Sequence, residues 1–173
     1  MTDPYAIRLA RTSELPRLTE IEDDAGEMYG EVEIDPDLPG LSREVLARGV
    51  DERLLWVVAD ASDAPVAFAL CWRYPEALHL RELDVHPEHM RRGLGRRLIE
   101  HVRGEAHAAG LPRLTLTTFT NVPWNAPLYR RYGFERMERD AMPPWLQAIR
   151  DEEDAGPLRA WPRCAMALRT GPG

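Results

Sequence analysis

Residues 85–102, VHPEHMRRGLGRRLIEHV, join the end of an apolar strand to the start of a helix through a basic turn that contains two glycines. The first N–H groups of a helix have no acceptors inside the helix, and the helix dipole adds to their attraction for an anion. Gly93 and Gly95 let an anionic group approach the backbone without meeting a Cβ atom. This order of strand, turn and helix predicts a phosphate-binding site.

Composition excludes several classes of protein. A length of 173 residues favours one domain, and a formal net charge of −7 argues against general nucleic-acid binding. Two cysteines indicate neither a disulfide framework nor a zinc pattern, and the absence of lysine excludes a Walker A loop. Because the first residues have no apolar core behind a basic end, and no later run approaches the length of a membrane span, we expect a cytoplasmic protein with no membrane partner.

Hydrophobic periodicity predicts alternating strands and helices along the chain. We expect strands at residues 5–10, 54–59, 65–74, 78–85, 114–119, 134–137 and 164–168, the second and third forming an antiparallel hairpin. We expect helices after Thr12, from Ser42 to Gly49, after Gly93 to near Gly110, from Pro123 to Gly133, and over residues 143–153. Residues 23–40 are acidic and rich in glycine and proline, which is typical of a loop with at most a short helical turn.

The strand at residues 78–85, LHLRELDV, changes phase in its middle. Its apolar residues fall at positions 78 and 80, and then at 83 and 85. A regular strand cannot keep one face with that pattern. We therefore predict a β-bulge or register break near Arg81 and Glu82.

The order of these elements, together with two motifs, resembles the GNAT superfamily of acetyl-CoA-dependent N-acetyltransferases over about residues 5–137. The motif LDVHPEHMRRGLGRRLI is similar to the family's pyrophosphate loop, Q/R-x-x-G-x-G/A, with Met90 at its first position. The motif NAPLYRRYGF resembles the asparagine, L-Y and G-F segment near the acceptor end of the cofactor.

The resemblance implies one α/β (α+β) domain over residues 1–173. A mixed, mostly antiparallel sheet of six to seven strands, with a bulged fourth strand, would carry helices on both faces, and residues 138–173 would complete the acceptor side.

The resemblance also implies acetyl-CoA as the cofactor. Loop amides and guanidinium groups would hold its phosphates, and its pantetheine arm would lie along the bulged strand. The cofactor-binding residues implied in this way are Leu83, Asp84, Val85, Arg91, Arg92, Gly93, Leu94, Gly95, Arg96, Asn125 and Tyr129. The usual family asparagine falls at Val122, beside Asn121. We favour Asn125, because it shares a helix face with Tyr129 at i, i+4.

Acetyl transfer to an amine requires a neutral amine, a stabilised oxyanion and a proton for the leaving thiolate. Tyr129 is the candidate proton donor, because a phenol with a reference pKa of about 10 stays protonated at neutral pH. Glu82, at the predicted break, is the candidate general base, with Glu27 and His79 as alternates. A backbone N–H near Leu83 or Asp84 is the candidate oxyanion donor.

Structural interpretations stand beside these functional ones. Tyr129 also fits a core aromatic, and Glu82 an exposed strand carboxylate. The acidic stretch of Glu20, Glu22, Asp23, Asp24 and Glu27 is typical of a solvated helix end, or of a pocket wall that attracts a cationic amine. The spacing of His79, His86 and His89 indicates turn or surface residues and no metal site.

The expected function is transfer of the acetyl group of acetyl-CoA to a primary amine of a small molecule. A protein N-terminus or side chain is the alternative acceptor, and a homodimer is left open. A non-catalytic acyl-CoA-binding module of the same fold remains a competing class. A dinucleotide-binding oxidoreductase is disfavoured, because the third glycine and an early βαβ unit are missing.

Overall fold

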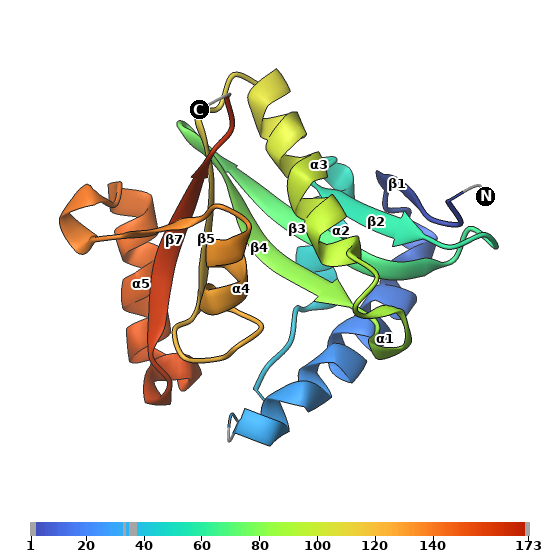
Figure 1. The fold of residues 1–173 in the computed structure, drawn as a ribbon, viewed down its shortest axis with the longest axis horizontal. Coiled ribbons are helices and arrows are strands. Elements are labelled where there is room, and N and C mark those ends of the chain that lie inside the picture. The colour runs from blue at the N-terminus through green and yellow to red at the C-terminus, as the bar shows by residue number, and fades with distance from the viewer. Residues whose placement is uncertain (1–2, 33, 35–37, 172–173) are drawn as a thin grey trace.

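The computed structural model describes residues 3–32, 34 and 38–171. Seven strands form one sheet in the order β1-β2-β3-β4-β5-β7-β6 (Figure 1). They are β1 (Ala6–Leu9), β2 (Leu55–Ala59), β3 (Pro65–Tyr74), β4 (Ala77–Val85), β5 (Arg113–Phe119), β6 (Glu135–Met137) and β7 (Arg163–Arg169). The pairing of β4 with β5 is parallel, and the other five pairings are antiparallel. The predicted mixed, mostly antiparallel sheet is confirmed.

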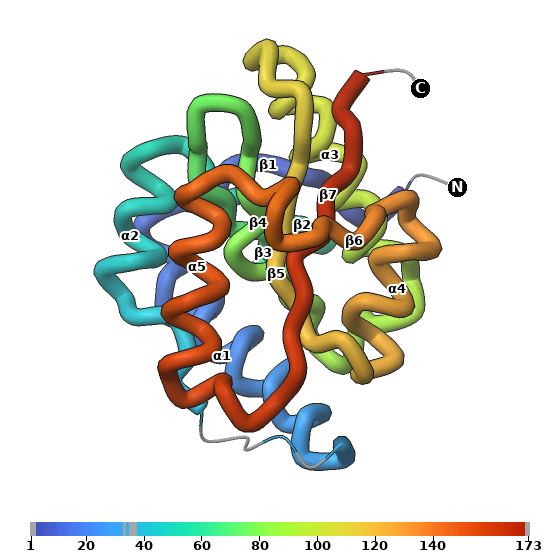
Figure 2. The backbone as a smooth tube through the Cα atoms, turned by 90° about the vertical axis from the view of Figure 1, so that its left-hand side faces the viewer, coloured from blue at the N-terminus to red at the C-terminus, as the bar shows by residue number. Residues whose placement is uncertain are grey.

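Helices cover both faces of the sheet, as predicted. The α-helices are α1 (Leu15–Gly26), α2 (Arg43–Asp51), α3 (Leu94–Ala108), α4 (Ala126–Arg131) and α5 (Pro144–Ala155). Short 3-10 helices are η1 (Thr12–Glu14), η2 (Glu27–Val32), η3 (Pro87–His89), η4 (Arg139–Ala141) and η5 (Pro157–Ala160). Helices α3 and α4 lie on one face, and α1, α2 and α5 lie on the other (Figure 2). Within the described ranges, no helix is both long and apolar enough to cross a membrane.

Two apolar layers hold the helices to the sheet. On one face, Leu98 and Val102 of α3 are fully buried in a cluster with residues of β2 to β5 and β7. On the other, Leu18 of α1 and Leu46 of α2 pack with Phe68 of β3. Full burial of such a side chain contributes about 1.5–3 kcal/mol. Both helical layers are therefore anchored to the sheet by buried apolar contacts.

Two helix boundaries differ from the sequence prediction. The first helix does not give way to a loop at Asp23 but continues as α1, because Ala25 extends its buried stripe, and η2 then follows. Helix α4 does not begin at Pro123. Its N-cap is Asn125, and Pro127 occupies the first turn, where a missing N–H costs no helical hydrogen bond.

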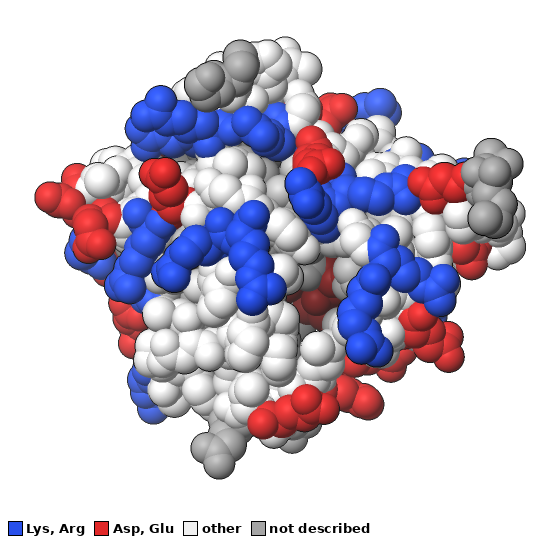
Figure 3. Space-filling view, in the orientation of Figure 1, with Lys and Arg blue, Asp and Glu red and all other residues white. Residues whose placement is uncertain are grey.

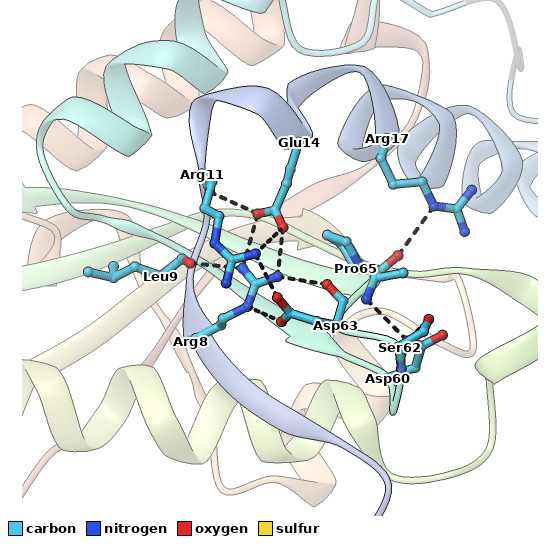
Figure 4. Close-up of polar contacts among 10 residues, drawn as sticks. Arg8, Leu9, Arg11, Glu14, Arg17, Asp60, Ser62, Asp63 and Pro65 are labelled. Atoms are coloured by element: carbon cyan, nitrogen blue, oxygen red, sulfur yellow. Dashed lines mark hydrogen bonds and ion pairs between the residues drawn. The ribbon is translucent and has the colours of Figure 1, made fainter.

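An ion-pair network fixes the start of α1 (Figure 4). Arg8 of β1 pairs with Glu14 at 2.6 Å and with Asp63, in the turn between β2 and β3, at 2.8 Å. Arg11 also pairs with Asp63, at 2.7 Å. The network ties the entry of α1 to the sheet, and α1 carries the acidic residues that reach the candidate site.

Strand β4 contains the predicted irregularity. Leu70 of β3 pairs with Glu82, but Cys71 pairs with Leu80, so that Arg81 is the extra residue on β4. One inserted residue bends a strand and changes the face to which later side chains point. The predicted bulge near Arg81 and Glu82 is confirmed.

Candidate active site

A cavity of about 760 Å³ lies where β4 and β5 part. The two strands pair only from Ala77 with Arg113 to Leu80 with Leu116, and the rest of each strand pairs only on its other side. The cavity walls come from α1, η2, residues 38–41, β4, β5, α4, η5 and the start of β7. Figure 3 shows acidic side chains deep in a hollow between α4 and the start of α3, with arginines around its rim.

Strand β4 sends alternate side chains to the two faces of the sheet beyond the bulge. Leu83 and Val85 pack against the core on the α3 face. Glu82 lies on the cavity wall, and burial raises the pKa of its carboxyl above the ordinary range, although Arg81 and Arg163 pull the pKa down. A carboxylate with a raised pKa is a better proton acceptor at neutral pH than an ordinary one.

Asp84, two residues further along β4, is a second carboxylate on the same wall. Its Oδ2 atom is completely buried and has no hydrogen-bond partner among the described residues. Burial raises the pKa of Asp84 well above its ordinary value, and the charges of Glu82 and Glu22 raise it further. A buried oxygen without a donor is rare in folded proteins, and at a cavity wall it is available to a ligand.

Helix α1 supplies a third carboxylate. Glu22 Oε1 accepts a hydrogen bond of 2.8 Å from the backbone N–H of Leu41. Burial, together with the charge of Glu82, raises the pKa of Glu22 to about 7. Asp23 and Glu27 line the cavity beside Glu22. Three residues of the acidic stretch, Glu22, Asp23 and Glu27, therefore form part of a pocket wall, whereas Glu20 and Asp24 do not line the cavity.

Helix α4 and its N-cap form another part of the wall, where Asn125 and Tyr129 of the NAPLY motif both line the cavity. Asn125 is 6% exposed, and its Nδ2 donates a hydrogen bond of 3.2 Å to the hydroxyl of Tyr29. The Tyr129 ring packs edge-on against Phe134, with ring centroids 5.6 Å apart. Burial raises the pKa of Tyr129, and it raises the pKa of Tyr29 to about 12, so both phenols are protonated at neutral pH.

Tyr29 is a site residue that sequence reasoning missed. It lies in η2, within the stretch that composition identified as a loop, and no motif surrounds it. His79, by contrast, was an alternate base and does not line the cavity. It is 1% exposed, bonds to Thr115 at 3.0 Å, and has its pKa lowered to about 4 by burial. His79 is therefore a neutral core residue.

Arg163 of β7 also lines the cavity and carries a positive charge. Its Nη2 donates to Glu153 of α5 at 3.1 Å, and its guanidinium lies 4.5 Å from the ring centroid of Phe119. Glu153 also pairs with Arg150 and accepts a hydrogen bond from Thr117. Arg163 therefore already has a carboxylate partner, Glu153, within the protein. Sequence reasoning missed this network, because its members are far apart along the chain.

The glycine-arginine loop connects β4 to α3. Arg91 has a φ of 60° and Gly93, the N-cap of α3, a φ of 75°, so the backbone turns through the left-handed region just before the helix. A Cβ added at Gly93 would meet nothing within 4 Å, and the backbone is open to approach there. Leu94 and Gly95 follow in the first turn of α3. The predicted order of strand, turn and helix N-terminus is confirmed.

The arginines of this loop differ in whether other residues of the protein already bind their guanidinium groups. Arg96 pairs with Glu100 at 2.9 Å along the helix surface. Arg92 makes a long contact of 3.4 Å to the backbone oxygen of Glu88, and Arg91 forms no salt bridge with any described residue. Arg91 and Arg92 are therefore the guanidinium groups of the loop most available to an anion.

Three residues of the turn after β4 bring potential metal donors together, although the sequence indicated no metal site. One donor atom each from His86, Glu88 and His89 lie within 4.8 Å of one another. His86 Nε2 lies 3.1 Å from an Asp24 oxygen, and His89 Nδ1 lies 2.9 Å from the Tyr5 hydroxyl. These partners account for the orientation of both rings without an ion.

A bulged strand that leads into a helix N-terminus, beside a cavity lined by a phenol and carboxylates, is the arrangement expected of an acetyl-CoA-dependent acyltransferase. Residues 51–136, from the end of α2 through β6, match the family model of the acetyltransferase (GNAT) domain. The chain belongs to the GNAT acetyltransferases, and the family predicted from its motifs is confirmed.

Solved structures agree with this fold. The ribosomal-protein-S18-alanine N-acetyltransferase from Escherichia coli is 21% identical, with 98% of this chain and 96% of that chain covered and a TM-score of 0.69. The PaiA N-acetyltransferase from Thermoplasma acidophilum, in complex with coenzyme A, is 14% identical over 95% of this chain and 98% of that one, with a TM-score of 0.71.

A third similar structure is N-acetylglutamate synthase from Neisseria gonorrhoeae, complexed with coenzyme A and N-acetyl-glutamate. It is 18% identical, with a TM-score of 0.75, and the match covers 99% of this chain but only 36% of that one. Identities of this size establish a common fold and leave the acceptor to be argued from the site itself.

Proposed function

We propose that the chain transfers the acetyl group of acetyl-CoA to a primary amine of a small molecule, by direct attack in a ternary complex. The observation that carries the proposal is that one cavity joins the Glu82 carboxylate and the Tyr129 phenol beside β4. The coenzyme A complexes of two similar proteins support the choice of cofactor.

The residues of the chain fit coenzyme A along its length. Backbone amides at residues 92–96 and the guanidinium groups of Arg91 and Arg92 would hold the phosphates, each charge-assisted contact contributing about 1.5–3 kcal/mol. Beyond Leu80 the β5 side of β4 pairs with no strand in the described part of the chain. The amides of the pantetheine arm would pair there with the backbone of Leu83 and Val85, as an added strand does.

When bound, acetyl-CoA supplies the thioester, and the protein supplies proton transfer and orientation. Glu82 accepts the proton of the incoming ammonium group, directly or through water, so that the amine attacks as the neutral base. A backbone N–H near Leu83 or Asp84 stabilises the oxyanion. Tyr129 would donate its proton to the leaving thiolate, and the proton that the nitrogen loses as the amide forms would restore the phenol. Asn125 contacts the pantetheine arm from the start of α4.

A protein N-terminus is the second candidate acceptor, and the likeness to the S18-alanine acetyltransferase favours it. A non-catalytic acyl-CoA-binding module is disfavoured, because such a module has no need of Glu82 and Tyr129 in its cavity. The cytoplasmic location and the homodimer stay predictions.

Calorimetry with acetyl-CoA and free-thiol release with a panel of amines test the proposal. We expect binding at micromolar to low millimolar concentration and amine-dependent thiol release. Glu82→Gln should keep the affinity and lower turnover by about 10²–10⁴-fold. Absence of acetyl-CoA binding would overturn the assignment.

A further inference from the structure

We propose that the acceptor carries a second cationic nitrogen, as a diamine or polyamine does, and that Glu22 and Asp84 hold this second ammonium group while Glu82 serves the nitrogen that reacts. The inference rests on the proposed acetyl transfer and names its substrate class. It makes Glu22 a specificity-determining residue.

The first support is the charge of the cavity wall. Among the described residues that line it, the acidic ones are Glu22, Asp23, Glu27, Glu82 and Asp84, and the basic ones are Arg81 and Arg163. Arg163 is paired with Glu153 at 3.1 Å, and the half-exposed Arg81 lies 4.0 Å from Glu82. The cavity thus holds more carboxyl than guanidinium groups. A bound cation would keep the carboxyl groups that have raised pKa values in their ionised form, whereas these groups would repel an anionic acceptor.

The second support is the oxygen of Asp84 that lacks a donor. A buried carboxylate oxygen without a hydrogen bond destabilises the free protein, since it has lost water and gained nothing in return. An ammonium group has three N–H donors and a positive charge. It would satisfy Asp84 Oδ2 and offset the repulsion between Asp84 and its two acidic neighbours.

Glu22 is held in place for this role. The Leu41 N–H occupies its Oε1 at 2.8 Å, and Gly40 lies against the same carboxylate. Glu22 comes from α1, whereas Glu82 and Asp84 come from β4, so the three carboxylates surround the cavity from two elements. A cation bound between them would contact carboxylates of α1 on one side and of β4 on the other.

The acceptor needs a second nitrogen because acetylation removes the positive charge of the first. A monoamine becomes a neutral amide, and it leaves the carboxylates without a cation as the reaction proceeds. A diamine retains one ammonium group from binding to product. Because this contact is equal in the ground state and the transition state, it lowers KM more than it raises kcat.

Three acceptors of one chain length test the inference with acetyl-CoA. Putrescine has an ammonium group at its far end, n-butylamine a methyl group and γ-aminobutyrate a carboxylate. We expect kcat/KM to fall in that order, with putrescine at least about tenfold above butylamine. The difference should lie mainly in KM.

Glu22→Gln keeps the shape and the oxygen that accepts from Leu41, and it removes the charge. We expect this variant to lose most of the preference for putrescine over butylamine. Glu20→Gln is the matched control, because Glu20 lies on α1, pairs with Arg17 and is 63% exposed outside the cavity. It should keep the wild-type preference.

Equal kcat/KM for putrescine and butylamine would overturn the inference and leave the acetyltransferase function standing. A protein that binds acetyl-CoA but acetylates γ-aminobutyrate, or only peptide N-termini, would also overturn it. Failure to bind acetyl-CoA at all would overturn the proposed function itself. Retention of the full preference in Glu22→Gln would overturn the role of Glu22.

Discussion

Glu22 Oε1 and the backbone N–H of Leu41 lie 2.8 Å apart, and their hydrogen bond joins α1 to the segment that precedes α2. Gly40 completes this contact. A Cβ atom at Gly40 would lie 3.0 Å from Glu22 Oε1, closer than nearly all real Cβ contacts. The absence of a side chain at Gly40 therefore leaves room for the carboxylate on the cavity wall.

Gly40→Ala should displace Glu22 without removing its charge. Because the shift is only a few tenths of an ångström, we expect KM for putrescine to rise about threefold to tenfold while the rate with n-butylamine stays near the wild-type value. Steady-state kinetics with both amines measure this. Gly30→Ala is the control, since a Cβ there meets nothing within 4 Å. An unchanged KM in Gly40→Ala would contradict the role given to this contact.

Glu22 also predicts a pH dependence of stability. Its pKa is about 7 in the folded protein, against about 4.3 for glutamate in an unfolded chain. Between these values the folded state binds more protons than the unfolded state, so the free energy of unfolding falls as pH rises through this window. Glu22→Gln should remove that loss.

Urea denaturation of wild type and Glu22→Gln, at about pH 8 and below about pH 4.5, measures the effect. We expect the variant to be more stable by about 1 kcal/mol at the higher pH, a figure reduced for the partial exposure of Glu22, and equal to wild type at the lower pH. Glu20→Gln should follow the wild-type pH dependence. A variant that gains stability equally at both pH values would show that the charge of Glu22 is not responsible.

Tyr129→Phe tests the proton donor. The ring and its edge-on contact with Phe134 remain, and only the hydroxyl is lost. We expect kcat to fall about 10²-fold or more, with little change in the Kd for acetyl-CoA. Tyr132→Phe is the matched control, because Tyr132 ends the same helix, packs against the same core and does not line the cavity. Equal activity of the two variants would make Tyr129 a packing residue.

The parts of the site that sequence could predict are those with a local signal. The bulge follows from the phase of residues 78–85, and the turn that leads into α3 follows from the glycine-containing segment before an amphipathic helix. Asn125 and Tyr129 share a helix face by their spacing, and the structure places both on the cavity wall.

The rest of the cavity wall, which includes Glu22, Tyr29 and Arg163, has no local signal in the sequence. Glu22 has the same local sequence context as a solvated helix end, and its burial depends on Leu41 and β4, which are distant in the chain. Tyr29 faces Asn125 only because α1 continues into η2. Arg163 reaches the wall because β7 pairs with β5 after the chain has passed through α5. These positions are decided by tertiary packing, which overrides local propensity.

Gly93→Ala tests the phosphate loop against a control that carries the same backbone strain. Gly93 at the start of α3 and Gly110 just after its end have φ values of 75° and 72°, and a Cβ at either position meets nothing within 4 Å. Alanine at either position therefore costs about 1–2 kcal/mol of stability for the left-handed backbone. Thermal unfolding should show similar destabilisation of both variants.

Acetyl-CoA affinity should separate the two variants. At Gly93 the added methyl group would stand where we propose that the phosphates approach the first amides of α3, and any backbone shift there would turn those amides away. We expect the Kd for acetyl-CoA to rise about tenfold or more in Gly93→Ala and to stay within about twofold of wild type in Gly110→Ala, as measured by calorimetry. If the two variants bind acetyl-CoA equally well, the phosphates do not lie at this helix N-terminus, and the cofactor must enter the cavity by another route.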